Sequence, residues 1–165
     1  MIDWWLLWRV PILALVVMVV WWFAIRPLVQ ERGWIAVKES FVICGTPGER
    51  AQGCVVDGDT VIIGFGSQRR RIRLTGFDAP ELDGACEAER MLAVEARARL
   101  EDWLAQGDFE WNGDTEPPRD QFGRELRAAR RIAADGSREY LAETMIAGGL
   151  ASESGWGAAP HDWCE

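Results

Sequence analysis

Four acidic residues lie around one predicted β-hairpin, and their spacing brings them to the same place. Residues 54–81 hold two apolar, β-branched runs separated by a glycine-rich turn, a pattern typical of a hairpin. Asp57 and Asp59 lie at one end of the hairpin, and Asp78 and Glu81 follow its other strand. Carboxylates that converge at a sheet edge are typical of a bound cation or of proton transfer.

The types of these residues favour a hard cation. Asp59 and Asp78 are the candidate ligands, whereas Asp57 is interpreted as an ordinary turn residue. Carboxylate and carbonyl oxygens suit Ca²⁺ or Mg²⁺, and the presence of one histidine, His161, argues against a zinc site. So few protein ligands would leave water in the coordination shell and give modest affinity.

Four separated motifs resemble, in their order, those of the staphylococcal-nuclease-like (thermonuclease) family. They are Val56–Thr60 (VDGDT), Arg73, Asp78–Glu81 (DAPE), and Asp120 with Gly123 and Arg124. The likeness runs from about Cys44 to Cys164, and four motifs in order are far more specific than DGDT alone. The resemblance implies an α+β fold, a five-stranded OB-like β-barrel with packed helices.

The resemblance also implies a metal site and a base. Asp59, Asp78 and the main-chain carbonyl of Ala79 would hold one Ca²⁺. Ala79 stands where the family often has threonine, which removes a hydroxyl but leaves the carbonyl. Glu81 would orient or deprotonate the attacking water; a solvated loop acid is the competing interpretation.

Arg73 and Arg124 match the family arginines that would clamp the scissile phosphate. Guanidinium forks bind phosphate oxygens in bidentate fashion and stay charged through the reaction. Arg69 and Arg71 alternate with Arg73 on one face of the predicted strand. That alternation is equally typical of a solvated sheet face and of a row of phosphate contacts.

Two aromatic residues are candidates for substrate binding. Phe122 occupies a place where some relatives have a tyrosine that contacts the nucleotide. Trp156 is a candidate stacking surface, because base–aromatic stacking tolerates any base. Packing of the C-terminal tail is the commoner role for such a tryptophan.

These residues predict a hydrolase, a calcium-dependent endo- or exonuclease that acts on DNA and/or RNA with a preference for single strands. A non-catalytic nucleic-acid or protein binding module on the same fold is the alternative. Residues 35–165 hold 15 basic and 24 acidic side chains, a net charge of −9. Nucleic-acid binding therefore requires a local basic patch and a metal rather than the overall field. The sequence identifies no protein partner.

The first 34 residues differ in composition from the predicted domain, residues 35–165. Six of the ten tryptophans lie there, and the 22 residues 4–25 contain one charged residue, Arg9. That length is enough to cross a bilayer, and tryptophans at both ends suit its interfaces. No small-residue cleavage site follows, so the sequence predicts an uncleaved single-pass transmembrane helix rather than a signal peptide.

The cysteines indicate the compartment. Four cysteines allow three pairings, and we predict Cys44–Cys54 and Cys86–Cys164, with four unpaired core thiols as the alternative. Disulfides form in oxidising compartments. The domain is therefore predicted to lie outside the cytoplasmic membrane, periplasmic or extracellular, although the charges flanking the apolar run do not settle its orientation.

The remaining elements follow from periodicity and turn residues. Helical spacing over Cys86–Leu104 predicts an amphipathic helix that covers the sheet. Asp108–Asn112 is a predicted strand, and a further strand falls within residues 121–133. Ser137 is the predicted cap of a helix over Arg138–Ala147. Residues 27–40 are predicted to be a connector. Strands, a helix, strands and a helix indicate an α+β domain.

Overall fold

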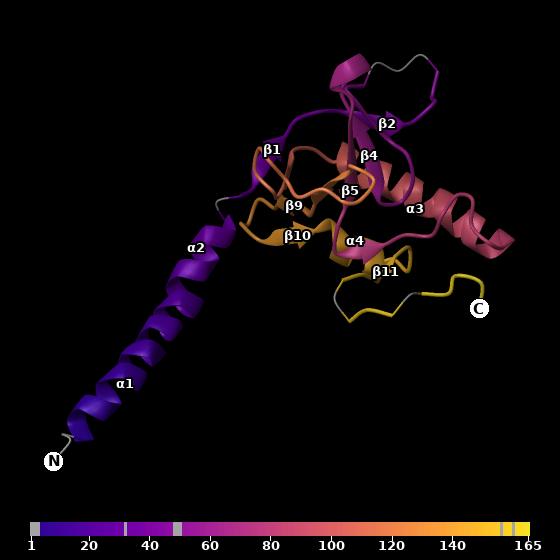
Figure 1. Ribbon diagram of the computed structural model, residues 1–165. Helices are drawn as coiled ribbons and strands as arrows, with labels where there is room; N and C mark the ends of the chain where they lie inside the picture. Colours follow the sequence, from indigo (N-terminus) through magenta and orange to yellow (C-terminus); the bar gives the residue numbers. More distant parts are fainter. Residues whose placement is uncertain (1–3, 32, 48–50, 156, 160) are drawn as a thin grey trace. The chain divides into compact units, whose positions relative to one another are not determined.

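An apolar helix forms the first of the two units, Met1–Trp34 and Ile35–Glu165, into which the chain divides in a computed structural model. The structure describes residues 4–31, 33–47, 51–155, 157–159 and 161–165. Helix α1 (Trp4–Val20) continues through a π-helical segment, η1 (Trp21–Ile25), into α2 (Arg26–Glu31), as the indigo ribbon of Figure 1 shows. Within this unit the side chains of residues 8–25 are all exposed.

This helix is long and apolar enough, over Trp8–Val29, to cross a membrane by length and composition. The predicted apolar segment ends at Ile25, but the helix continues through α2. The guanidinium of Arg26 lies 4.2 Å from the centre of the Trp22 ring, a cation–π contact at the end of the apolar run. The predicted connector over residues 27–40 is therefore wrong, because it contains both α2 and the first strand of the second unit.

The second unit is α+β, as predicted, and contains three sheets among its described residues. The largest has the order β2-β3-β4-β5-β8 and consists of Phe41–Ile43, Gly53–Val55, Thr60–Ile63, Arg70–Leu74 and Glu125–Arg127. A second has the order β1-β7-β9-β10 and consists of Ile35–Val37, Phe109–Trp111, Ala129–Ile132 and Arg138–Tyr140. The third pairs β6 (Phe77–Asp78) with β11 (Ser152–Glu153). No sheet closes into a barrel through the described strands, so the OB-like barrel stays a prediction.

The predicted hairpin is present as the antiparallel pair β4–β5. Its register places Thr60 opposite Arg73 and Ile63 opposite Arg70. A short 3₁₀ turn, η2 (Gly66–Gln68), joins the strands. Gly64 has φ +84°, and a Cβ there would come within 2.7 Å of the Gln68 carbonyl oxygen, so the turn requires a residue without a side chain.

Helix α3 (Glu87–Ala105) confirms the predicted amphipathic helix. Cys86 is its N-cap, and its sulfur accepts the N–H of Glu89 at 3.4 Å. The buried face of the helix packs on β2 and joins an aromatic cluster in the core. That face consists of Ala93, Ala96, Leu100, Trp103 and Leu104, and the cluster joins Phe41, Trp103, Phe109 and Trp111.

The predicted helix over Arg138–Ala147 is shorter than expected. Arg138–Tyr140 forms strand β10, and helix α4 runs from Leu141 to Ala147. Ser137 is therefore not a helix cap; its N–H donates to Asp135 Oδ1 at 2.9 Å in a turn. Pairing of β10 with β9 gives Arg138–Tyr140 ladder hydrogen bonds, which outweigh the local capping signal.

Candidate active site

Asp59 lies in a tight turn between β3 and β4. Its N–H donates to Asp57 Oδ1 at 3.1 Å, so Asp57 shapes the turn, as predicted. Gly58 lets this turn approach its surroundings closely, since a Cβ there would lie 2.7 Å from the Cβ of Ala79 and 2.9 Å from that of Ala96 on α3. The turn therefore packs between α3 and the second acidic segment, and only 3% of Asp59 is exposed.

The guanidinium of Arg73 bridges the two predicted metal ligands. Its Nη2 lies 2.9 Å from Asp59 Oδ2 and also donates to Asp78 Oδ1. The N–H of Ala79 lies 3.4 Å from Asp59 Oδ2, and the hydroxyl of Thr60 donates to Asp59 Oδ1 at 2.9 Å. Two carboxylates thus share one positive group, and the two acidic segments lie together, as the hairpin pattern predicts.

The charge of this pair favours a further cation. Burial raises the pKa of Asp59 to about 7; Arg73 opposes this rise, and Asp57 adds to it. A divalent ion beside Asp59 would favour its ionised form. The carboxylates of Asp59 and Asp78, with the carbonyl of Ala79 next in the chain, are hard oxygen donors that fit Ca²⁺. No third carboxylate, thiol or imidazole converges on them among the described residues, so water would complete the coordination.

Glu81 stands on a short loop that α3 holds in place. The carboxylate of Glu89 accepts the N–H of Ala85 at 2.7 Å and that of Glu81 at 3.4 Å. Arg90 Nη1 donates to the carbonyl of Gly84 at 2.8 Å. Both ends of the loop are therefore fixed to the first turn of the helix.

The electrostatic surroundings of Glu81 place it with the other candidate residues. Partial desolvation raises the pKa of Glu81, and the charges of Asp57 and Asp78 add to that rise. Arg73 and Arg124 oppose it. An exposed carboxylate with a raised pKa, beside two arginines, is suited to accept a proton from water.

Arg124 is positioned by Asp120. Asp120 Oδ2 accepts Arg124 Nε at 2.7 Å, and Asp120 Oδ1 accepts the main-chain N–H groups of Arg124 and Phe122, each at 2.9 Å. Gly123, at φ +78°, closes the turn. The guanidinium of Arg124 lies 5.5 Å from the centre of the exposed Phe122 ring. Asp120 thus orients Arg124, which explains the spacing of this motif.

Strand geometry sets the face on which the arginines of β5 lie. β5 runs parallel to β8 with Arg73 opposite Leu126. Because alternate residues share a face, Arg71 and the extended residue Arg69 before the strand lie on the same side as Arg73. Arg124 directly precedes β8, and its charge acts on Glu81 as that of Arg73 does.

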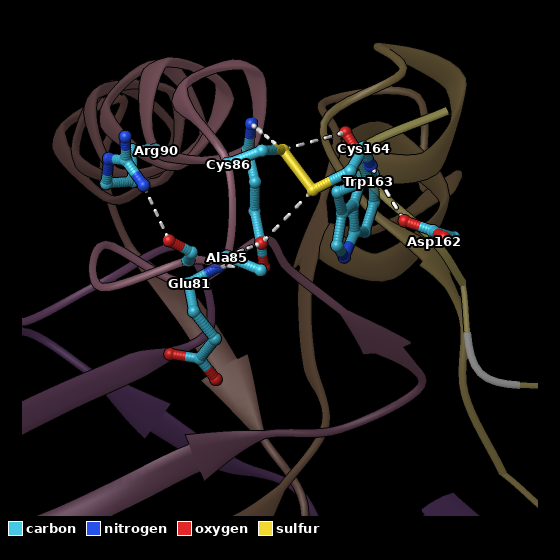
Figure 2. Close-up of a disulfide and its surroundings, with 9 residues drawn as sticks. Glu81, Ala85, Cys86, Arg90, Asp162, Trp163 and Cys164 are labelled. Atoms are coloured by element: carbon cyan, nitrogen blue, oxygen red, sulfur yellow. Dashed lines mark hydrogen bonds between the residues drawn. A yellow bond between two sulfur atoms is a disulfide. The ribbon is translucent and has the colours of Figure 1, made fainter.

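Both predicted disulfides are confirmed. Cys44–Cys54 and Cys86–Cys164 have Cα–Cα distances of 4.9 Å and 5.9 Å. The second ties the C-terminal segment to the N-cap of α3, and in Figure 2 the side chain of Glu81 points away from it. Glu89 lies near both of these sulfur atoms, but oxidised cysteines supply no thiolate for a metal.

The substrate-binding roles of Trp156 and Phe122 stay predictions, and the contacts of two further acids, Glu89 and Glu125, were not predicted. Trp156 lies outside the described residues, so its stacking role stays a prediction. Phe122 contacts Arg124 rather than the core. Glu89 has a sequence signal, since it stands three residues after the N-cap like the acid of a capping box. Glu125 is buried among arginines, and no sequence signal indicates its position.

No protein-family model matches this chain, and no curated protein matches it.

Proposed function

We propose that this protein is a calcium-dependent nuclease that hydrolyses phosphodiester bonds of DNA and/or RNA. One observation carries the proposal: Asp59 and Asp78 share the guanidinium of Arg73 in a site whose electrostatics also include Glu81 and Arg124. Together with Ala79, these five residues are the ones that the resemblance to thermonucleases assigns to metal binding, water activation and phosphate binding.

The chain's own residues would supply the proton acceptor and, together with the ion, the positive charge that such a reaction needs. A Ca²⁺ held by Asp59, Asp78 and the carbonyl of Ala79 would supply positive charge beside the phosphate. Glu81 accepts a proton from water as the water oxygen bonds to phosphorus. The 5′ P–O bond breaks, the leaving oxygen is protonated by solvent, and a 3′-phosphate remains.

Arg73 and Arg124 stabilise the charge that develops on phosphorus. Each now donates to a carboxylate, Arg73 to Asp59 and Asp78, and Arg124 to Asp120. When substrate binds, phosphate oxygens would accept some of these hydrogen bonds in place of the carboxylates. Because guanidinium groups stay charged, they stabilise the five-coordinate transition state more strongly than the substrate.

The proposed setting is a single-pass anchor in the cytoplasmic membrane with the catalytic domain outside the cytoplasm. The apolar N-terminal helix, predicted to contact lipid over residues 4–25, supports the anchor. The two disulfides support an oxidising compartment. The five-stranded sheet β2-β3-β4-β5-β8, with helix α3 packed on β2 and β3, supports the five-stranded OB-like barrel that the thermonuclease resemblance implies.

Hydrolysis of single-stranded DNA and RNA by the full chain in detergent tests the proposal. We expect cleavage in Ca²⁺, none in chelator, and a loss of roughly 10²–10⁴-fold in Glu81→Gln, the range for a general base. Glu95→Gln, on the exposed side of α3, is the matched control. Oligonucleotide binding without cleavage would instead support the non-catalytic binding module.

A further inference from the structure

A groove runs over the outer face of β3, β4 and β5, beside the candidate active site. Its cavity of about 480 Å³ is lined by Cys44, Val56, Ile62, Arg69 and Arg71. Val56 directly precedes Asp57, so one end of the groove reaches the turn that carries the acidic residues. Cys44 lies beside Val56 at this same end, because Ile43 pairs with Val55 in the parallel strands β2 and β3. The other end reaches Arg69, at the tip of the β4–β5 hairpin.

The two arginines of the groove have no acidic partner among the described residues. Arg69 and Arg71 are exposed and make no side-chain hydrogen bond or ion pair there. Their neighbours on the same strand differ, since Arg70 pairs with Glu125 at 2.6 Å and Arg73 pairs with Asp59 at 2.9 Å. In a domain with a net charge of −9, two adjacent unpaired arginines form a local site for an anion.

The spacing of these arginines suits a chain of phosphates. Arg73, Arg71 and Arg69 follow one another on one face at intervals of about 7 Å, twice the rise of an extended residue. This interval is close to that between successive phosphates of an extended single strand. The row begins at the arginine proposed to bind the scissile phosphate, so one strand can contact all three.

The hairpin tip offers an aromatic surface at the far end of the row. Phe65 is 72% exposed and lines a second cavity of about 300 Å³ together with Arg69 and Ile62. An exposed phenylalanine beside unpaired arginines is the combination that binds single strands, because unpaired bases stack on aromatic rings while arginines bind the backbone.

We propose that this groove binds the part of a single-stranded nucleic acid that flanks the cleaved bond. Arg71 and Arg69 bind successive phosphates, and Phe65 stacks with a base beyond them. The inference rests on the proposed nuclease activity and makes its substrate a polymer, since a dinucleotide is too short to reach Phe65.

Kinetics on two substrates test the groove in the full chain in detergent. We compare kcat/KM for a dinucleotide and for a single strand of about 12 nucleotides, a length within the range of single-strand binding sites. The ratio of the two values is expected to fall by about tenfold in R69Q/R71Q, as the loss of roughly 1.4 kcal/mol gives. Arg99→Gln, an exposed arginine on α3, should leave the ratio unchanged.

Binding of the same labelled oligonucleotide separates charge from stacking. In R69Q/R71Q the slope of log affinity against log salt should weaken by about 1.4, since each phosphate contact on a single strand contributes about 0.7. Phe65→Ala should weaken binding without changing the slope. An unchanged ratio and slope in R69Q/R71Q, with cleavage by the parent chain intact, overturns the groove and leaves the proposed function standing.

Absence of cleavage by the parent chain would contradict the proposed function, and binding then decides the groove alone. Oligonucleotide binding that weakens in R69Q/R71Q and not in R99Q supports the groove as a binding site. Equal binding by both variants, or no binding by the parent chain, overturns it.

Discussion

The two faces of β5 carry opposite arrangements of charge. On one face, the guanidinium of Arg73 lies between two carboxylates, Asp59 and Asp78. On the other face, the single buried carboxylate of Glu125 accepts from three arginines, Arg70, Arg119 and Arg127. The first group has a surplus of negative charge and the second a surplus of positive charge, although Arg73 and Arg70 stand only three residues apart on one strand.

The pKa directions of the two buried carboxylates show what this difference means. Burial raises the pKa of Asp59 to about 7 in spite of Arg73. Hydrogen bonds from Arg70 lower the pKa of Glu125, and those from Arg127 add to the effect despite burial. Glu125 is therefore fully compensated by its neighbours, whereas Asp59 is not. A carboxylate pair that one arginine leaves uncompensated is where a further cation would bind most favourably.

Replacing one β5 arginine on each face should show which face takes part in catalysis and which one only stabilises the fold. Arg73→Gln should lower kcat/KM on single-stranded DNA by roughly 10²–10³-fold, the cost of losing one donor to the transition state. Arg70→Gln, the matched change on the other face, should cost about threefold or less, because Glu125 keeps two arginines. Steady-state kinetics in saturating Ca²⁺ measure both, and equal losses would contradict the assignment of the two faces.

Removing the carboxylate of the second face should mainly change stability. Glu125→Gln leaves the guanidinium of Arg127, whose side chain is 2% exposed, without its charge partner. The free energy of unfolding should fall by about 3 kcal/mol, as for other broken buried ion pairs. Urea denaturation measures the fall, with Glu95→Gln as control. A loss of kcat larger than that of stability would mean that this cluster takes part in the reaction.

The two carboxylates also predict opposite pH dependences. The pKa of Asp59 is raised from 3.8 to about 7, so its contribution to stability is present below 3.8 and is lost as the pH rises through about 7. The pKa of Glu125 is lowered, so its contribution is present above the ordinary value and is lost as the pH falls through the folded value. Thermal unfolding in chelator should therefore show Tm falling toward pH 7 in the parent chain but not in Asp59→Asn. The same Tm in both at every pH would refute this prediction.

The first face of β5 could be predicted from sequence because its determinants are local. Asp59 and Asp78 lie within one hairpin and the segment that follows it, and alternation alone puts Arg73 beside them. The disulfides were predictable for a similar reason: Cys44 and Cys54 flank one short loop, Cys86 and Cys164 remain, and four cysteines allow only three pairings.

The second face was not predictable, since its contacts depend on distant pairing. Glu125 meets Arg70 only because β5 and β8 run parallel across 55 residues, which no local pattern indicates. At Ser137, distant strand pairing instead overrode a local signal. Its capping signal was clear, but pairing of the next three residues with β9 determined their structure.

Glu89 belongs to neither face of β5. Replacing it should have the smallest effect of these variants, and it tests whether α3 positions Glu81. Its carboxylate holds the N–H groups of Ala85 and Glu81, so Glu89→Ala should lower stability by about 1 kcal/mol and kcat by about three- to tenfold. A loop that carries Glu81 less firmly also relieves the partial desolvation of its carboxylate, which moves the acid limb of the kcat profile toward the ordinary pKa of glutamate. Glu89→Gln keeps one hydrogen-bond acceptor, so it should retain part of the stability and part of the kcat that Glu89→Ala loses. A loss of stability with kcat and its pH profile unchanged would make Glu89 a purely structural residue, and Glu81 would then not depend on the helix for its position.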